Sequence, residues 1–278
     1  MDDWKVLDKK LFPYAYNILG NIDDSQDVIQ DVWIRYNEKD LGSISNQKAY
    51  LVKAVINQAI NQKKKNDRER QKKIILPEPI VTNQGEQKIE LEEILNYSLL
   101  VLLDALNVKE RAVFLLKEAF DYEHDDIAEI LAISVENSRQ LLTRAKKKLK
   151  LRKPDVVTST TKDSTQLEKY VEAIRKGDVN SLEQMLSDEV QVLADAGNKL
   201  KAIAQLTSGI KDTVKLMTYV FECYQKDLDI KIEEINHQPA LLFYRGTTLI
   251  NCQIFELNPE RKVIRIFSVV DPDKLLNI

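Results

Sequence analysis

Residues 125–153, DDIAEILAISVENSRQLLTRAKKKLKLRK, predict two helices joined by a tight turn. Asp125 and Asp126 suit the N-terminus of the first helix, and Ser134 can cap the second. Apolar residues recur at helical spacing in both helices, so each has one side that can face a core. This pattern is typical of a helix-turn-helix, which places the start of its second helix in the major groove of DNA.

The outward side of the second helix carries side chains that can bind base edges and phosphates. Between residues 139 and 153 there are eight Lys or Arg residues and no acid, which favours contact with phosphates. From this pattern alone, a solvated amphipathic helix with a basic tail is the alternative. The candidate DNA contacts are Asn137, Ser138, Arg139, Gln140, Thr143, Arg144 and Lys147.

Length and composition are those of a globular protein with two or three domains. The 278 residues are 44% hydrophobic and 31% charged, with a net charge of −3. Residues 1–153 carry 26 bases and 25 acids, whereas residues 154–278 carry 15 bases and 19 acids. Uneven charge of this kind suits a protein that holds DNA with one surface and a protein partner with another.

The sequence contains no pattern typical of a disulfide framework, a metal site, a nucleotide site or a catalytic site. Cys223 and Cys252 are too few for a disulfide framework, and their apolar surroundings predict two buried free thiols. No metal-ligand spacing, nucleotide-binding loop or nucleophile motif occurs, so we expect no metal, no cofactor, no catalytic residue and no enzyme activity. No apolar run approaches the length of a membrane span, and no hydrophobic signal core follows Met1, so we expect a cytoplasmic protein without a membrane partner.

Three helical patterns occupy the N-terminal block. The first ends at Gly20, a natural C-cap, the second covers residues 23–36, and the third covers residues 46–65. The connector at 68–90 contains Pro77, Pro79 and Gly85 and lacks any period. Helices are then expected at 91–106 and 109–120, before the helix-turn-helix.

The pattern of the sequence changes after a polar linker at 154–165. Two short helices, 166–176 and 179–186, precede a helical stretch at 200–208 and 210–219. Runs that favour β-strands lie at 190–193, 230–235, 240–244, 248–256 and 262–270. Helices followed by antiparallel strands indicate an α+β domain with a curved sheet wrapped on helices.

Three motifs in this order resemble the extracytoplasmic-function class of bacterial sigma factors, over about residues 5–152. The stretch DDSQDVIQDVWIRY at 23–36 is similar to the acidic helix that such proteins dock on RNA polymerase. The stretch NQKAYLVKAVINQAINQKKK at 46–65 resembles the helix placed against the minus-ten promoter element. Residues 106–149 resemble the domain that reads the minus-35 element.

The resemblance assigns roles to individual side chains. An exposed acidic ridge and its neighbours would bind polymerase through Asp24, Asp27, Gln30, Asp31 and Trp33. Opened promoter DNA would be held by amides and a basic helix end, namely Asn57, Gln58, Asn61, Lys63 and Lys64, with a base pocket in the loop at 40–45. A plain solvated face and a soluble linker start are the alternatives for these two groups.

Residues 166–278 resemble the SnoaL-like cone-shaped α+β fold, which some sigma factors carry as an extension. LPEP at 76–79 and VVDPDKL at 269–275 are similar to a linker motif and a terminal motif of that subgroup. Where the subgroup has DGGGK, this chain has DAGNK at 195–199, a less permissive loop. The residues implied in contact between linker and cone are Leu76, Pro77, Glu78, Pro79, Asp195, Lys199, Asp271, Pro272, Asp273 and Lys274.

Some SnoaL-like cones are enzymes, which need a proton-transferring pair inside an apolar pocket. His237 falls in the turn NHQP, and Asp195, Tyr219, Tyr224 and Tyr244 are expected to be core or rim residues. A fold that can host catalysis does not establish it.

We therefore expect a multidomain chain of two all-α sigma domains, the second a helix-turn-helix, followed by an α+β SnoaL-like cone. The boundaries are 1–67 for the minus-ten domain, 68–90 for a linker, 91–153 for the minus-35 domain, 154–165 for a second linker and 166–278 for the cone.

The expected function is that of a promoter-recognition subunit that brings core RNA polymerase to promoter DNA. The cone would regulate it in cis, so that no separate anti-sigma factor is required. Two alternatives are open: a helix-turn-helix transcription regulator fused to an isomerase-like cone, and a cone that binds a small apolar molecule.

Overall fold

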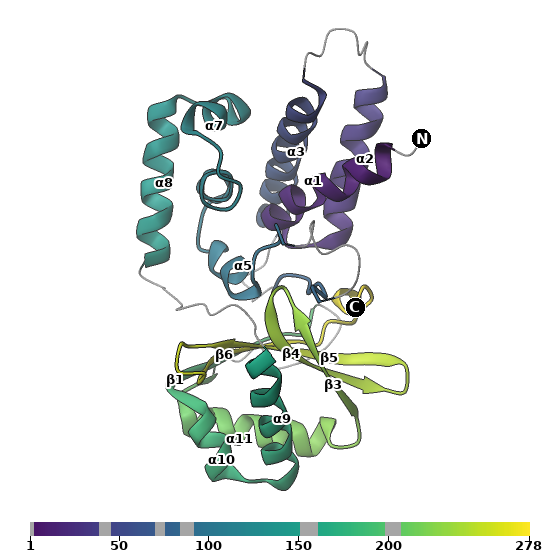
Figure 1. The fold of residues 1–278 in the computed structure, drawn as a ribbon, viewed down its shortest axis with the longest axis vertical. Coiled ribbons are helices and arrows are strands. Elements are labelled where there is room, and N and C mark those ends of the chain that lie inside the picture. The colour runs from purple at the N-terminus through teal and green to yellow at the C-terminus, as the bar shows by residue number, and fades with distance from the viewer. Residues whose placement is uncertain (1–2, 39–45, 70–75, 84–91, 151–160, 198–206) are drawn as a thin grey trace. The chain divides into compact units, whose positions relative to one another are not determined.

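A computed structural model describes residues 3–38, 46–69, 76–83, 92–150, 161–197 and 207–278. The chain divides into two compact units (Figure 1). The helical unit comprises Met1–Gln71, Glu86–Leu95 and Leu99–Lys153. The cone unit comprises Lys72–Gly85, Asn96–Ser98 and Pro154–Ile278. Part of the connector between the two sets of helices therefore belongs to the cone unit.

The helical unit begins with three helices: α1 (Asp3–Leu19), α2 (Ile22–Asn37) and α3 (Gln47–Glu69). Gly20, at φ 71°, follows α1, and its N–H donates to the carbonyl of Tyr16, as is typical of a glycine that ends a helix. The side chain of Asn21 accepts from the N–H of Asp24 and caps α2. Apolar side chains of the three helices pack into one cluster, which confirms the predicted helical block.

The second set of helices begins with α5 (Tyr97–Leu103) and α6 (Val108–Phe114) and continues through a π-helical turn, η3 (Leu115–Ala119). It ends with α7 (His124–Leu131) and α8 (Val135–Lys150). Asn107 and Glu110 form a capping box at the start of α6. The expected helix at 91–106 is shorter in the structure, because the described residues before Tyr97 form a turn.

One hydrophobic cluster contains side chains from both sets of helices. Asn17, at the end of α1, is fully buried and links the two sets: its side chain donates to the carbonyl of Glu93 and accepts from the N–H of Leu95. Its carbonyl accepts two hydrogen bonds from the Arg111 guanidinium, at 3.1 and 2.9 Å. Because these groups are buried, losing one partner would leave others without hydrogen bonds.

The cone unit places helices on one face of a six-stranded sheet (Figure 1). The helices are α9 (Thr161–Lys176), α10 (Val179–Met185) and α11 (Ile210–Val220), followed by η4 (Phe221–Gln225). The strands are β1 (Leu186–Asp195), β2 (Thr207–Ser208), β3 (Asp229–Ile235), β4 (Gln238–Arg245), β5 (Thr248–Leu257) and β6 (Val263–Val269). A short 3-10 helix, η5 (Pro272–Lys274), follows β6. The predicted α+β class is confirmed.

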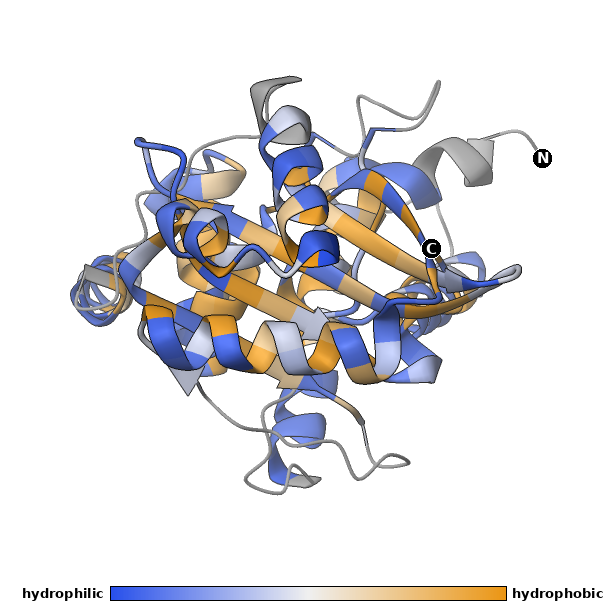
Figure 2. Cartoon of the chain, turned by 90° about the horizontal axis from the view of Figure 1, so that it is seen from below, coloured by the Kyte–Doolittle hydropathy of each residue, from blue (hydrophilic) through white to orange (hydrophobic). Residues whose placement is uncertain are grey.

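The order of the strands is β2-β1-β6-β5-β4-β3, and only the pair β1–β6 is parallel. Side chains alternate between the two faces, so Phe255 and Ile266 join the helix-side core while Phe267 points to the opposite face. There the ring of Tyr97 lies 5.4 Å from that of Phe267. Figure 2 shows strands that are apolar along much of their length.

Two expectations about single side chains need correction. Cys223 lies on η4 and is exposed, so only Cys252 is a buried thiol. Tyr219 and Tyr224 are 57% and 63% exposed, so they are surface residues and not core residues. The helical period of residues 210–219 did not indicate which side of α11 faces the sheet. The helix at 200–208 lies mostly outside the described residues, and Thr207 and Ser208 form β2.

The two cysteines are predicted to differ in reactivity, because the thiolate is the reactive form and burial raises the pKa of the Cys252 thiol. A disulfide reagent such as DTNB should label the native protein at Cys223, and Cys223→Ser should remove that reaction. Cys252 should react only after denaturant is added. Equal reaction of both thiols in the native protein would contradict this placement.

Candidate nucleic-acid interface and docked linker

Helix α8 is the second helix of the helix-turn-helix. The turn before it passes through Ala132 in the left-handed region at φ 50°, and Ser134 accepts from the N–H of Asn137, which caps α8. Arg139, Gln140, Thr143 and Arg144 are exposed, as are the basic side chains at 146–148. Their positive charge and hydrogen-bonding groups are those needed to reach phosphates and base edges.

Ser138 was expected to face outward, and this is wrong. Its side chain is fully buried, and its Oγ lies 2.8 Å from Nδ1 of His124 on α7. The pair fixes α7 against α8, so Ser138 supports α8 from behind. Asn137 is half-buried. Helical spacing could not separate Ser138 from its exposed neighbours, because residues at the edge of an apolar stripe can turn either way.

Helix α3 carries the amides and lysines expected to hold opened DNA. Asn61 is exposed, and Gln58 and Lys64 are half-buried. Asn57 donates to the carbonyl of Ile130 on α7 at 2.8 Å, next to an ion pair between Lys53 and Glu129.

Lys63 is buried, and its Nζ lies 3.3 Å from a carboxylate oxygen of Asp67 and of Asp104. Part of the expected DNA-binding face of α3 is therefore bonded within the helical unit in this structure. The expected base pocket at 40–45 lies outside the described residues.

Helix α2 presents an acidic ridge. Asp27, Gln30 and Asp31 are exposed along one side of it. Asp24 is half-buried and accepts from Asn66 of α3 at 2.8 Å.

Trp33 packs toward the core, with its ring 5.4 Å from that of Tyr36. Sequence reasoning missed Ile34, which continues the ridge and is 48% exposed. Its position in the sequence, seven residues after Asp27 and three after Asp31, places it on the same side of the helix and is the signal that could have identified it.

Residues of the linker motif are docked on the cone unit by a buried charge. Asp195, at the end of β1, is 3% exposed. Its Oδ2 accepts from the N–H of Leu76 and from Nζ of Lys274, both at 2.7 Å, and its Oδ1 accepts from the N–H of Gly197 at 2.9 Å. Nζ of Lys274 also donates to the carbonyl of Leu76. We call the group of Leu76, Asp195 and Lys274 the linker clasp.

Other groups hold the rest of the motif. Glu78 is buried and accepts from Asn277 at 2.8 Å, and the carbonyl of Pro77 accepts from Tyr97 Oη at 2.7 Å. Pro79 is buried, whereas Pro272 and Asp273 are exposed on η5. Lys199 lies outside the described residues.

Asp271 begins η5 by accepting from the N–H of Asp273. A Cβ at Gly197, whose φ is 63°, would collide with the carboxylate of Asp271. Glycine is therefore needed at this position of DAGNK.

The turn between β3 and β4 also binds the linker, which sequence reasoning missed. Asn236 is fully buried in the left-handed region at φ 46°, and it exchanges two hydrogen bonds with Ile80. Thr82 donates its N–H to the carbonyl of Glu234. The motif NHQP marked a turn, but nothing in it indicated a binding partner 156 residues away in sequence.

Comparisons with known proteins agree with this arrangement. A family model described as Sigma-70, region 4 matches residues 97–149, the segment from α5 to α8. The ECF RNA polymerase sigma factor SigJ of Mycobacterium tuberculosis is 23% identical over 233 residues, which cover 81% of this chain and 74% of the relative. The probable ECF sigma factor SigI of the same species is 22% identical over 203 residues, which cover 69% of each chain.

The crystal structure of Mycobacterium tuberculosis SigJ matches 99% of this chain and 98% of its own, with a TM-score of 0.78 and 19% identity. This chain is a homologue of the ECF sigma factors. The fold of this chain is therefore that of the SigJ crystal structure. No helix in the described ranges has the length and apolar character to cross a membrane, and no group of three or more potential metal ligands occurs there.

Replacing Asp195 with Asn should loosen the linker clasp, because Lys274 would lose its buried counter-charge. Loss of one partner from such a pair costs about 3–5 kcal/mol. Hydrogen exchange at the amides of Leu76, Glu78 and Ile80 should therefore accelerate. Asp188→Asn, at an exposed position of the same strand, should leave it unchanged. If both variants exchange like the unchanged protein, the clasp does not hold the linker.

Proposed function

We propose that this sigma-factor homologue is a promoter-specificity subunit of RNA polymerase whose SnoaL-like domain regulates it in cis. The observation that carries the proposal is the region 4 match over residues 97–149, which coincides with a helix-turn-helix that exposes Arg139, Gln140, Thr143 and Arg144. In this role α8 reads the minus-35 element, with phosphate contacts from the basic side chains that follow.

The acidic ridge of α2 would dock on core polymerase. Asp27 and Asp31 supply negative charge, Gln30 supplies hydrogen bonds, and Ile34 supplies an apolar contact that polymerase would cover. Contacts of this composition combine electrostatic steering with burial of an apolar side chain.

Helix α3 would hold the opened minus-ten element. Asn61 and Lys64 are accessible, whereas Asn57 and Lys63 must first leave Ile130 and the two aspartates. Engagement of DNA by these two residues therefore requires α3 to separate from α7 and from Asp104, which follows α5. The contacts within the helical unit favour a form that is not yet competent to bind opened DNA.

The cone unit would act through the linker clasp. A linker fixed at Leu76 limits how the two DNA-binding regions can be spaced, since both ends of the connector lead to them. Such a built-in restraint takes the place of a separate anti-sigma partner. In this role the protein is cytoplasmic and has no catalytic activity of its own.

The test of this function is a pull-down with core RNA polymerase followed by permanganate footprinting of a bound promoter. We expect a stoichiometric complex that opens promoter DNA. A chain that binds duplex DNA alone as a dimer and fails to bind core polymerase would instead be a helix-turn-helix regulator. In that case the proposal is wrong.

Replacing Arg139 with Ala should weaken recognition of the upstream element, because a bidentate contact to guanine is worth about 1–3 kcal/mol. Binding of the holoenzyme to a promoter with the preferred element should fall by about tenfold or more, while binding to a scrambled element changes little. Arg245→Ala, at an exposed position of β4, is the matched control. Equal losses on both promoters would mean that Arg139 contacts only phosphates.

A further inference from the structure

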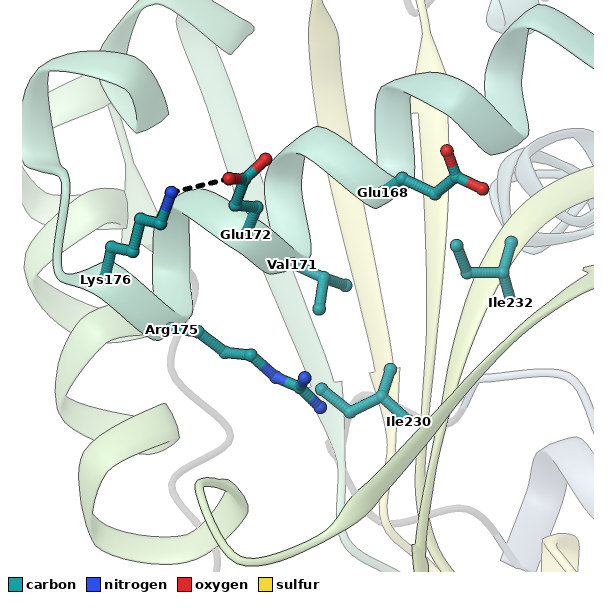
Figure 3. A pocket seen from close by; sticks show the side chains of 7 residues that line it. All are labelled: Glu168, Val171, Glu172, Arg175, Lys176, Ile230 and Ile232. Carbon is teal, nitrogen blue, oxygen red and sulfur yellow. Dashed lines mark hydrogen bonds and ion pairs between the residues drawn. The ribbon is translucent and has the colours of Figure 1, made fainter.

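A groove lies between helix α9 and strand β3 of the cone unit (Figure 3). Its volume is about 390 Å³, and it opens to solvent. Val171 of α9 and Ile230 and Ile232 of β3 form its apolar floor, and all three are half-buried. Glu168 and Arg175 lie at opposite ends of the groove, near Ile232 and Ile230 respectively.

Strand β3 lies at the edge of the sheet, and part of its edge already pairs with another segment. Val81 forms an antiparallel bridge with Ile235. The carbonyl of Glu234 and the N–H of Asn236 bond the linker, so the backbone groups of these residues point away from β4. This edge of the sheet therefore accepts a strand in the antiparallel direction.

No described residue pairs with the neighbouring part of the same edge. Backbone groups alternate in direction along a strand, so those of Ile230 and Ile232 also point away from β4. Neither residue has a backbone partner on that side within the part of the chain that the structure describes. The side chains that form the floor of the groove thus belong to residues with free backbone donors and acceptors. An unpaired edge of this kind is a template for another strand.

The two ends of the groove carry opposite charges from α9, which favours one direction for a bound segment. Glu168 and Arg175 are separated by two helical turns, about 10 Å, and neither has an ion-pair partner among the described residues. Glu172 pairs with Lys176 at 2.5 Å, which leaves the two end charges available. Three side chains on one face of an extended strand span about 13 Å. This span is somewhat longer than the separation of Glu168 and Arg175, and the length of the arginine side chain accommodates the difference.

We propose that the α9–β3 groove binds an extended peptide segment of a partner protein, which pairs with β3 as an added antiparallel strand. Read from its N-terminus, the segment carries a basic, an apolar and an acidic side chain at alternate positions. The basic side chain meets Glu168, the apolar one covers Val171, Ile230 and Ile232, and the acidic one meets Arg175. Through this groove the cone unit binds a second protein. The proposed site does not depend on the proposed role in transcription.

The test measures fluorescence anisotropy of a labelled peptide, Ser-Lys-Thr-Val-Thr-Glu-Ser, with the full chain. We expect saturable binding below roughly 1 mM, and no binding of the same peptide methylated on the backbone nitrogens that face β3. Arg175→Glu should weaken binding by about tenfold, because it replaces attraction by repulsion. A peptide with lysine in place of glutamate should bind this variant better than the unchanged protein.

Lys169→Glu is the matched control, since Lys169 is an exposed residue of α9 outside the groove and the charge change is the same. Absence of binding, equal effects of Lys169→Glu and Arg175→Glu, or failure of the charge-swapped peptide to restore binding would overturn the proposal. So would a dimer of the peptide-free protein that Arg175→Glu dissociates, because the groove would then be occupied by a second copy of the chain.

Discussion

The carboxylate of Asp195 is the group on which the arrangement of the connector depends. It is buried, and three donors satisfy it: the N–H of Leu76, the ammonium of Lys274 and the N–H of Gly197. A buried charge needs such partners, so docking of the linker stabilises the cone unit. Burial of the Leu76 side chain adds about 2 kcal/mol in the same direction.

In the helical unit a buried positive charge is likewise satisfied by hydrogen bonds. Arg111 is almost fully buried and donates twice to the backbone carbonyl of Asn17, which ties α6 to the first helix of the chain. The contacts of Asn57 and Lys63 extend this packing to α3. Within the proposed function, these two residues, which DNA would engage, are held by partly buried polar contacts until DNA replaces those partners.

Periodicity and capping were sufficient to predict most helices and strands, because these signals are local. The clasp residues Leu76, Asp195 and Lys274 came from a resemblance to known motifs, and nothing in their own spacing indicated that they meet. Asn236, Tyr97 and Gln238, which also hold the linker and the start of α5, escaped prediction because their partners are distant in sequence. Ser138 was misplaced because its partner, His124, lies on the other helix of the pair.

The central claim is that docking of the linker on Asp195 sets the spacing at which the two DNA-binding regions meet a promoter. Run-off transcription with reconstituted polymerase, on promoters whose spacer between the two elements varies by single base pairs, tests it most directly. The unchanged protein should prefer one spacer length, and Asp195→Asn should flatten that preference while Asp188→Asn preserves it. Identical spacer profiles for all three proteins would contradict the account.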